Sequence, residues 1–288
     1  MGGDRGSPAV TRVTSTRNER VRAAATLARR RERRRTGRHL VEGPHAVTAA
    51  LDAGAVETVF VTATSRAQDL ASVLDDLDVG AVPDDVEVVA VTDHVLAHLA
   101  DTRSPQGVVA VARDVAVDLR DLPGHGLVVV LDRLADPGNV GGIVRTADAA
   151  GAAAVICLRG TTDVLGPKAV RAAAGSTYHV PLVVDAEVGE AVAALRAQRR
   201  RLLGLDGRAS RSVLDLAPDG PVALVLGSEA HGLDDEVRTH LDATVAVPMR
   251  GGAESLNVAV AAGVAIYAAA VGIGTTAQPR PGEPAAGD

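Results

Sequence analysis

The residues that could perform chemistry lie in three short loops, each of which follows an apolar run. The first loop is the segment DPGNVGGIVR over residues 136–145. We expect Asn139 to cap the helix that follows, and Arg145 lies about a turn and a half further along that helix. An arginine near a helix N-terminus suits an anion or a developing negative charge. A simple cap and a surface arginine would give the same pattern, because the segment matches neither the dinucleotide nor the P-loop fingerprint.

The second loop, LGSEAHGL over residues 226–233, places Glu229 between two glycines at the end of another apolar run. A carboxylate at that position can accept a hydrogen bond from a ligand. Alternatively, Ser228 or Glu229 caps a helix expected over 232–241. His231 raises the question of a catalytic triad, but GSEAHG lacks the G-x-S-x-G pattern of a nucleophilic serine. The pattern therefore favours a ligand-binding carboxylate or a helix start over covalent catalysis.

The third loop, VPMRGGAESLNVAV over residues 247–260, leads from a strand into a helix that is almost devoid of polar residues. We expect Ser255 to cap this helix. Asn257 is the exception on it, because burying an unpaired amide costs about 1–3 kcal/mol. Asn257 therefore needs a hydrogen-bond partner.

These loops require a scaffold that gathers the ends of several strands. Beyond residue 126, apolar runs alternate with helical stretches, which is typical of a parallel sheet covered by helices on both faces. Ligands bind such sheets beyond the carboxyl ends of the strands. The predicted strands are 127–134, 152–158, 179–184, 201–207, 222–229 and 243–249. The predicted helices are 140–150, 166–175, 187–200, 232–241 and 255–270.

The preceding residues predict a smaller α/β domain. Its expected helices are an arginine-rich one between 18 and 38, and others at 44–52, 66–77 and 93–101. Its expected strands are 39–43, 56–63, 85–92 and 107–113. The proline and glycines of DLRDLPGHG indicate a linker. The predicted organisation is a first domain over 1–117 with an arginine-rich segment at 17–38, a linker at 118–126, a second domain over 127–273, and a flexible tail at 274–288.

Composition and charge exclude several classes of protein. The 288 residues are 47% hydrophobic and 23% charged, as in a globular protein of about two domains. Cys157 is the single cysteine, which excludes an internal disulfide and fits a reducing cytoplasm. The apolar run 258–273 is shorter than the ~20 residues that span a bilayer, so we expect a buried helix. The net charge is −6, yet residues 1–40 contain twelve arginines and three carboxylates, which indicates a local polyanion site.

Taken together, the three loops resemble the three motifs of the SpoU (TrmH-like) branch of the SPOUT RNA methyltransferases. The motifs N-x-G-x-x-x-R, L-G-S-E-x-x-G-L and V-P-M-x(5)-S-L-N-V-x-V-A occur in the family's order within residues 127–270, with Ala230 where the family has glycine. The segment LVEGPHAV at 40–47 is similar to the family's substrate-binding domain, a small α/β module akin to certain ribosomal proteins. The resemblance implies a C-terminal SPOUT domain with a parallel sheet and a deep trefoil knot, although knots are rare in proteins generally.

The resemblance also implies an activity and the residues that carry it. Enzymes of this family transfer a methyl group from S-adenosylmethionine to a ribose 2′-hydroxyl in structured RNA, and they act as homodimers. The family's catalytic and RNA-binding positions fall on Asn139, Arg145, Glu229, Ser255 and Asn257. The cofactor-binding candidates are Gly227, Val247 and Leu256, together with Met249 and Leu205. No metal is expected, because the sequence contains no evident cluster of metal ligands.

The arginine-rich segment is the expected contact with the RNA backbone, and a solvated helix face is the alternative. Its candidate residues are Arg29, Arg30, Arg31, Arg33, Arg34 and Arg35. A separate N-terminal domain favours a large structured target, so we expect 23S rRNA, with tRNA as the alternative. A non-catalytic RNA-binding protein that kept the fold is the alternative function, and the missing dinucleotide fingerprint disfavours an oxidoreductase. We expect a cytoplasmic protein without a membrane partner.

Overall fold

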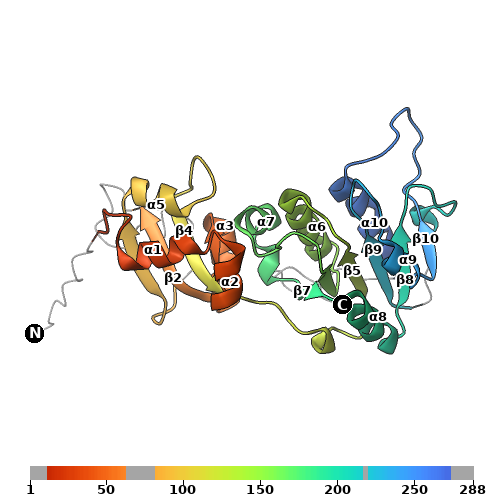
Figure 1. Cartoon of the computed structure of the whole chain (residues 1–288), viewed down its shortest axis with the longest axis horizontal. Helices are drawn as coiled ribbons and strands as arrows, with labels where there is room; N and C mark the ends of the chain where they lie inside the picture. Colours follow the sequence, from red (N-terminus) through yellow and green to blue (C-terminus); the bar gives the residue numbers. More distant parts are fainter. Residues whose placement is uncertain (1–11, 63–81, 217–219, 274–288) are drawn as a thin grey trace, which may run out of the picture. The chain divides into compact units, whose positions relative to one another are not determined.

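The structure, a computed structural model, describes residues 12–62, 82–216 and 220–273 (Figure 1). The chain forms two compact units. One comprises Met1–Val115 with Leu165–His179, and the other comprises Ala116–Val164 with Val180–Asp288. The helix expected at 66–77 and the tail expected at 274–288 lie outside the described residues.

The first unit is built on a four-stranded mixed sheet with the strand order β1-β4-β2-β3. Its strands are β1 (Arg38–Glu42), β2 (Val56–Thr62), β3 (Glu87–Val91) and β4 (Val108–Arg113). β4 is antiparallel to both β1 and β2, whereas β2 and β3 are parallel. All four strands lie where the apolar runs predict them.

Helices bury apolar side chains against both faces of this sheet. On one face, α3 (Pro44–Asp52) packs with β2 in a core that includes Val47 and Val59. On the other face, α1 (Glu19–Thr26) and α5 (Asp93–Leu99) enclose Phe60 of β2. Val59 and Phe60 enter different cores because successive side chains of a strand point to opposite faces.

The single arginine-rich helix predicted between residues 18 and 38 is wrong, because the structure has two helices there. α1 ends at Thr26 and α2 covers Arg30–Thr36. The side chain of Arg33 is buried and stabilises the intervening turn. Its Nη1 donates to the carbonyl oxygens of Leu27, at 2.7 Å, and of Ala28, at 2.8 Å. These bonds satisfy carbonyl groups at the end of α1 that have no partner within the helix.

A segment from the middle of the chain belongs to the first unit. Residues 165–179 contain α7 (Pro167–Ala173) and the short 3-10 helix η2 (Ser176–Tyr178). Val170 joins the core beneath α3, and the Tyr178 hydroxyl lies 2.8 Å from His39 Nε2. Arg171 Nη1 donates to Asp101 Oδ2 at 2.6 Å. The segment is therefore attached by apolar packing, a hydrogen bond and an ion pair.

The second unit contains a six-stranded sheet with the order β10-β8-β9-β5-β6-β7, and every neighbouring pair is parallel. Its strands are β5 (Leu127–Leu131), β6 (Ala154–Leu158), β7 (Leu182–Ala186), β8 (Arg201–Leu205), β9 (Val222–Leu226) and β10 (Ala243–Val245). The parallel α/β sheet predicted from the continuous apolar runs is thus confirmed. The linker region contains the short 3-10 helix η1 (Leu119–Asp121).

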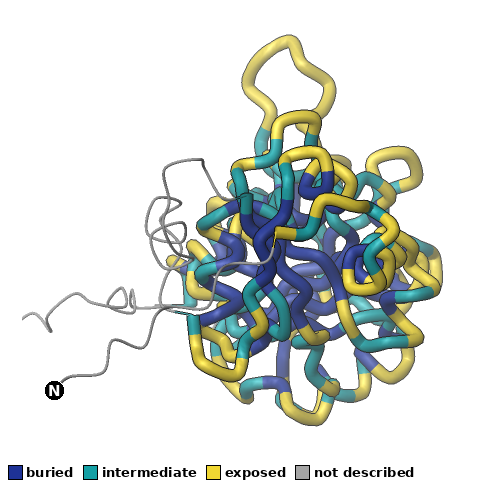
Figure 2. Tube along the Cα trace, turned by 90° about the vertical axis from the view of Figure 1, so that its left-hand side faces the viewer, coloured by how far each residue is buried: buried dark blue, intermediate teal, exposed yellow. Residues whose placement is uncertain are grey.

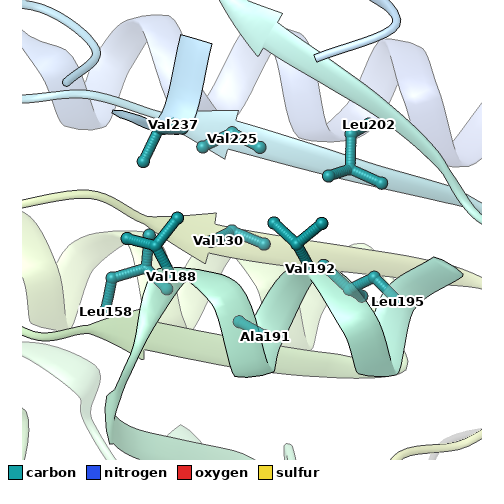
Figure 3. A pocket seen from close by; sticks show the side chains of 9 residues that line it. All are labelled: Val130, Leu158, Val188, Ala191, Val192, Leu195, Leu202, Val225 and Val237. Carbon is teal, nitrogen blue, oxygen red and sulfur yellow. The ribbon is translucent and has the colours of Figure 1, made fainter. Parts of the chain in front are cut away.

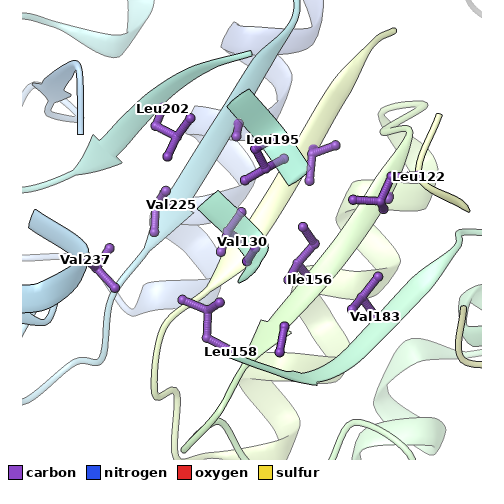
Figure 4. Packing of buried hydrophobic residues seen from close by; sticks show 14 of the residues in the cluster. Leu122, Val130, Ile156, Leu158, Val183, Leu195, Leu202, Val225 and Val237 are labelled. Atoms are coloured by element: carbon purple, nitrogen blue, oxygen red, sulfur yellow. The ribbon is translucent and has the colours of Figure 1, made fainter. Parts of the chain in front are cut away.

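Helices cover this sheet (Figure 1), and its strands are buried. Buried segments of the chain are dark blue in Figure 2. The covering helices are α6 (Pro137–Ala149), α8 (Val188–Ala197), α9 (Asp235–Arg238) and α10 (Val258–Gly272). Figure 4 shows the apolar cluster beneath α8, in which Leu195 packs with alternate strand residues such as Val130 and Val225. α6 and α10 pack against each other and against β5, β6 and β9. The helix predicted over 232–241 is only the four-residue α9.

A small cavity remains between α8 and the sheet (Figure 3). Its volume is about 20 Å³, and its lining is entirely apolar. Val188, Ala191, Val192 and Leu195 of α8 face Val130 and Val225 across it. Such a gap holds at most about one water molecule and offers that water no polar partner. The cavity is therefore a packing defect and not a ligand site.

α10 is buried along one face only, which corrects the expectation of a buried helix. Val260, Val264, Tyr267 and Val271 are exposed, with relative accessibilities from 36% to 76%. Their spacing of four, three and four residues puts them in one apolar stripe. None of the described helices combines the length and the apolar composition that spanning a bilayer requires.

Candidate active site

The three loops singled out in the sequence leave one edge of the parallel sheet. α6 follows β5, the loop 227–233 follows β9, and the loop 246–257 follows β10. The strand register pairs Leu131 with Leu226, Leu226 with Leu205, and Leu205 with Val245. The last residues of these four adjacent strands therefore lie side by side, and the loops begin together.

A chain of hydrogen bonds joins the three loops. The side-chain nitrogen Nδ2 of Asn139, on α6, donates to Glu229 Oε1 in the loop after β9. The side-chain nitrogen Nδ2 of Asn257, before α10, donates to Asn139 Oδ1 at 3.2 Å. The three residues are far apart in the sequence, so only the fold brings them together. Asn257 lies exposed at the start of α10, so the expectation that burial forces a partner on it is wrong, although its side chain does bond to Asn139.

The backbone N–H groups at the N-terminus of α10 determine which side-chain atoms donate and which accept in this series of hydrogen bonds. Asn257 Oδ1 accepts from the backbone N–H groups of Ala259, at 2.9 Å, and Val260, at 3.4 Å. Because its oxygen is used in this way, the amide nitrogen of Asn257 must donate to Asn139. Asn139 then accepts with its oxygen and donates with its nitrogen. Glu229 is therefore the acceptor at the end of the chain, which suits an ionised carboxylate.

Two of the predicted helix caps are wrong by two or three residues. The cap of α6 is Asp136, whose Oδ1 accepts from the N–H of Asn139 at 3.0 Å. Asn139 is the third residue of the helix, which leaves its side chain available to Glu229. The cap of α10 is Asn257 and not Ser255. Ser255 lies exposed in the loop and makes no hydrogen bond within the described ranges.

Arg145 lies on α6 and is exposed. Within residues 12–62, 82–216 and 220–273, its guanidinium has neither a hydrogen bond nor an ion pair. Asn139, Gly142 and Arg145 follow one another at a spacing of three residues, which places them along one ridge of the helix. A Cβ on Gly142 would lie 3.8 Å from the Cβ of Ala259 on α10, so this ridge passes close to the third loop's helix. Arg145 is thus an available cation on the helix that carries Asn139.

The loop that carries Glu229 is a tight turn. Ser228 and Gly232 exchange two backbone hydrogen bonds, of 3.0 and 2.8 Å. A Cβ on Gly227 would come within 2.3–2.4 Å of the backbone of Gly232 and Leu233, so only glycine fits there. The positive φ of the turn, +67°, occurs at Gly232. Ala230, which replaces a glycine of the family motif, needs no such freedom because its φ is not positive.

The candidate cofactor residues follow the ends of three neighbouring strands. Leu205 ends β8, Gly227 follows β9, and Val247 follows β10 by two residues; all three are half-buried. Met249 and Leu256 lie further along the loop before α10, with relative accessibilities of 41% and 38%. In the parts of the chain that the structure describes, the backbone groups of Gly227 and Val247 make no hydrogen bond. These groups and apolar side chains are available to a ligand.

The arginine-rich segment presents five exposed arginines and one buried arginine. Arg33 has a relative accessibility of 8% and holds the end of α1, so it is not on the surface. Arg35 pairs with Glu32 at 2.8 Å. The exposed members are Arg29, Arg30, Arg31, Arg34 and Arg35.

The sequence-based site omits a buried carboxylate at the same edge of the sheet. Asp132 directly follows β5 and is 1% exposed. Burial raises the pKa of Asp132, and the hydrogen bond from the N–H of Asp234 and the nearby Arg133 partly offset this effect. The signal in the sequence is an aspartate at the end of the apolar run 127–131. Within the described ranges, no three histidine, cysteine or carboxylate side chains gather as a metal site.

Comparison with known proteins agrees with this architecture. Residues 126–267 match the model of the SpoU rRNA Methylase family, and residues 18–110 match the MRM3-like substrate binding domain. The chain is 31% identical over 256 residues to the 23S rRNA (guanosine(2553)-2′-O)-methyltransferase RlmP of Bacillus subtilis, covering 88% of this chain and 97% of that protein. It is 34% identical over 273 residues to the 23S rRNA (uridine(2479)-2′-O)-methyltransferase of Streptomyces viridochromogenes, covering 91% and 93%.

Solved structures of similar proteins share the fold. The SpoU methyltransferase AviRb from Streptomyces viridochromogenes, in complex with AdoMet, superimposes with a TM-score of 0.79 at 34% identity, over 88% of this chain and 98% of that one. An AdoMet-bound rRNA methyltransferase from Sinorhizobium meliloti gives a TM-score of 0.77 at 29% identity, over 91% and 98%. The parallel sheet and the three-loop site thus define an α/β methyltransferase. The chain belongs to the SpoU rRNA methylase family.

Proposed function

We propose that this protein transfers a methyl group from S-adenosylmethionine to a ribose 2′-hydroxyl of 23S rRNA in the cytoplasm. The observation that carries the proposal is the hydrogen-bonded chain of Glu229, Asn139 and Asn257, with the exposed Arg145 on the helix of Asn139. The relatives from Bacillus subtilis and Streptomyces viridochromogenes bear the names of 23S rRNA 2′-O-methyltransferases, which supports this substrate.

The residues at the ends of β8, β9 and β10 suit S-adenosylmethionine. The backbone N–H and C=O groups of Gly227 and Val247 can pair with the polar edge of an adenine base. The side chains of Leu205, Met249 and Leu256 offer apolar surface for the ring and the sugar. When bound, this cofactor supplies a methyl group activated by the positive charge of its sulfur.

The side chains of the site provide the remaining requirements of methyl transfer. A guanidinium keeps its proton in proteins, so Arg145 does not act as the base. Arg145 instead stabilises the negative charge that develops on the 2′-oxygen, or holds the neighbouring phosphate. Glu229 or an RNA phosphate accepts the proton of the hydroxyl. Asn139 and Asn257 orient Glu229, and the exposed Ser255 hydroxyl binds the ribose.

The decisive experiment measures label transfer from tritiated S-adenosylmethionine. Purified protein is incubated with separate pools of 23S rRNA, 16S rRNA and tRNA, and Arg145→Ala serves as the matched control. We expect label in the 23S pool, absent with the variant and recovered in an alkali-resistant dinucleotide. Label confined to tRNA would overturn the proposed substrate. Cofactor binding by calorimetry, with no label in any RNA or in ribosomal particles, would leave only a non-catalytic RNA-binding role.

The exposed arginines of α2 and the preceding turn form the proposed contact with the RNA backbone. Arg29, Arg30, Arg31, Arg34 and Arg35 present guanidinium groups at the surface of the first unit. Such contacts release counterions from RNA, so the affinity should fall steeply with salt. This assignment retains five of the six predicted arginines, because Arg33 has a structural role.

We propose a homodimer formed through the stripe of Val260, Val264, Tyr267 and Val271 on α10. An apolar stripe of this kind, continuous along the helix, is typical of a protein–protein interface. Val264→Arg would place a charge in its centre. We expect this variant to sediment as a monomer while the wild type sediments as a dimer. A monomeric wild type would refute the proposal.

We further propose that the chain is knotted and that its domains follow the predicted boundaries, except that residues 165–179 pack with the first domain. In support of a deep trefoil knot, residues 211–213 pair with Ala246 on the way to α10, and the 3-10 helix η3 (Val213–Asp215) packs against α10. The matched segment 18–110 falls within the domain proposed at 1–117. The matched segment 126–267 begins one residue before the domain proposed at 127–273, and 118–126 would link the two domains. An experimental trace through residues 206–257 tests the knot.

A further inference from the structure

The loop that carries Glu229 is closed by one residue, Asp132. Its backbone N–H donates to the carbonyl of Leu226, the last residue before the loop, at 2.8 Å. Its Oδ2 accepts from the N–H of Asp234, the first residue after the loop, at 2.6 Å. Asp132 therefore holds both ends of the segment 227–233.

The position of Asp132 is itself fixed by its neighbours. The next residue, Arg133, adopts a left-handed φ of +53° and pairs with Asp234. The N–H of Arg133 donates to Thr161 Oγ1 at 3.0 Å, and this hydroxyl donates to the carbonyl of Leu131 at 2.9 Å. A Cβ on Gly160 would come within 2.9 Å of Arg133 Cγ, so glycine there leaves room for the arginine. The turn after β5 is thus held on two sides.

Burial of the Asp132 carboxylate costs free energy, and side-chain packing alone does not account for an aspartate at this position. Burying a carboxylate removes it from water, and it is tolerated only where hydrogen bonds compensate. Here the carboxylate satisfies the part-buried N–H of Asp234 and lies 3.4 Å from Arg133 Nε. An apolar residue would leave that N–H without a partner and would remove one of the contacts that hold the far end of the loop.

We propose that Asp132 is a positioning residue for Glu229, an inference that rests on the proposed function. Asp132 does not take part in the hydrogen-bonded chain. It acts by fixing the loop on which Glu229 meets Asn139. Catalytic groups must be held within a fraction of an ångström, because a displacement of ~1 Å can reduce a rate about 100-fold.

The cofactor end of the same loop should be independent of the Asp132 carboxylate. Gly227 directly follows β9 and packs against the backbone of Gly232. The strand and this contact therefore place Gly227. Loss of the Asp132 carboxylate should therefore lower the rate of methyl transfer but leave the affinity for the cofactor nearly unchanged.

The experiment compares Asp132→Ala and Asp132→Asn with a matched control, Asp242→Ala. Asparagine keeps an oxygen that can accept from the N–H of Asp234, so it should rescue the rate. Asp242 has the same chemistry, because its carboxylate accepts from the N–H of Leu202 at 2.8 Å and pairs with Arg196 at 2.7 Å. It lies just before β10, at the opposite end of the strands from the site.

We expect Asp132→Ala to lower the single-turnover rate about 10- to 100-fold, with the dissociation constant for S-adenosylmethionine changed less than about threefold. Asp132→Asn and Asp242→Ala should stay within about threefold of the wild-type rate. In a Glu229→Ala background, Asp132→Ala should have little further effect, because a residue that acts through Glu229 has nothing left to position. Full additivity of the two substitutions would overturn the inference.

Hydrogen exchange provides a readout that does not require activity. We expect the hydrogen-bonded amides of Ser228, Gly232 and Asp234 to lose protection in Asp132→Ala but not in Asp132→Asn. Unchanged protection in the alanine variant would refute the role of Asp132 whatever the activity. A wild type that binds no S-adenosylmethionine and labels no RNA would instead refute the proposed function, and the exchange result would still decide the inference.

Discussion

Replacement of Asn257 offers a test that separates folding from catalysis at one position. The side chain has two functions in the structure: its oxygen caps α10, and its amide nitrogen donates to Asn139. Asn257→Ala removes both functions. Asn257→Asp keeps the cap but cannot donate to Asn139 Oδ1. If Asn139 turned its amide round to donate to the new carboxylate, its oxygen would face Glu229 and the chain would break there instead.

The magnitudes follow from these contacts. Loss of an N-cap costs about 1 kcal/mol, and loss of one exposed hydrogen bond costs about 0.5–1 kcal/mol. We therefore expect Asn257→Ala to lower the free energy of unfolding by about 1.5–2 kcal/mol. Asn257→Asp should change it by less than about 0.5 kcal/mol, because a carboxylate also suits a helix N-terminus. Both variants should lower the single-turnover rate at least about tenfold, the effect of ~1.4 kcal/mol in the transition state.

The assays are urea unfolding and single-turnover transfer of tritiated methyl groups to RNA. Asn257→Ser, which retains a capping oxygen, is the second control and should behave like the aspartate variant. A stable Asn257→Asp protein with the wild-type rate would show that the hydrogen-bonded chain has no role in catalysis. A strongly destabilised one would show that the assignment of the cap is wrong.

Three further predictions concern other parts of the molecule. Gly227→Ala should weaken S-adenosylmethionine binding at least about tenfold in calorimetry, because a Cβ there would overlap the backbone of the loop; unchanged affinity would exclude the residue from the cofactor site. Arg33→Ala should lower the midpoint of urea unfolding, because it leaves carbonyl groups of the turn after α1 without their donor. The matched variant Arg31→Ala should leave this midpoint unchanged and reduce the salt dependence of RNA binding in filter assays. The opposite pattern would reverse these two roles. A hydrogen bond from Arg196 lowers the pKa of Asp242 in the folded protein. Asp242 therefore stabilises the folded state at pH values above its unfolded pKa of ~3.9, and this contribution is lost as the pH falls through its pKa in the folded protein. Asp242→Asn should therefore be less stable than the wild type in unfolding at pH 7, with the difference shrinking below about pH 4; a difference independent of pH would contradict this assignment.

The strands could be predicted from the sequence because their signal is continuous burial. In the second unit, the runs that became β5, β6 and β9 have no polar residue, as expected for strands covered on both faces. The resemblance to the family motifs singled out the candidate site, because glycines and amides at strand ends are common in ordinary turns and do not mark a site by themselves. The contact of Glu229 with Asn139 follows from adjacent strands and not from their separation in sequence.

The helix caps could not be predicted from residue type alone. Asp136 and Asn139 are both good capping residues, as are Ser255 and Asn257, and in each pair the earlier or later residue could serve. The choice depends on where the chain leaves the sheet. In the first pair, Pro137 fixes the first turn and makes Asp136 the cap, which is a local signal that the prediction of Asn139 overlooked. In the second, the cap is the residue that also reaches Asn139, a tertiary contact that no local pattern contains.

Which charged side chains are buried could not be predicted from the sequence either. Arg33 lies within a run of arginines that is otherwise exposed, and only the turn between α1 and α2 gives its guanidinium partners. Asp132 stands at a strand end where an exposed aspartate is common. In both cases a backbone group from a neighbouring loop or helix end decides the role of the side chain.

The attachment of residues 165–179 to the first unit affects how the protein can be divided. The chain passes from the first unit to the second, returns for α7 and η2, and passes back again, so a cut in the linker does not separate two complete pieces. A fragment beginning at residue 118 would keep Val170 and Tyr178 but lose the residues that cover them. Isolated halves would each expose apolar surface and would tend to aggregate. A deletion of the first unit that also replaces residues 165–179 by a short polar loop would respect the units that the fold contains.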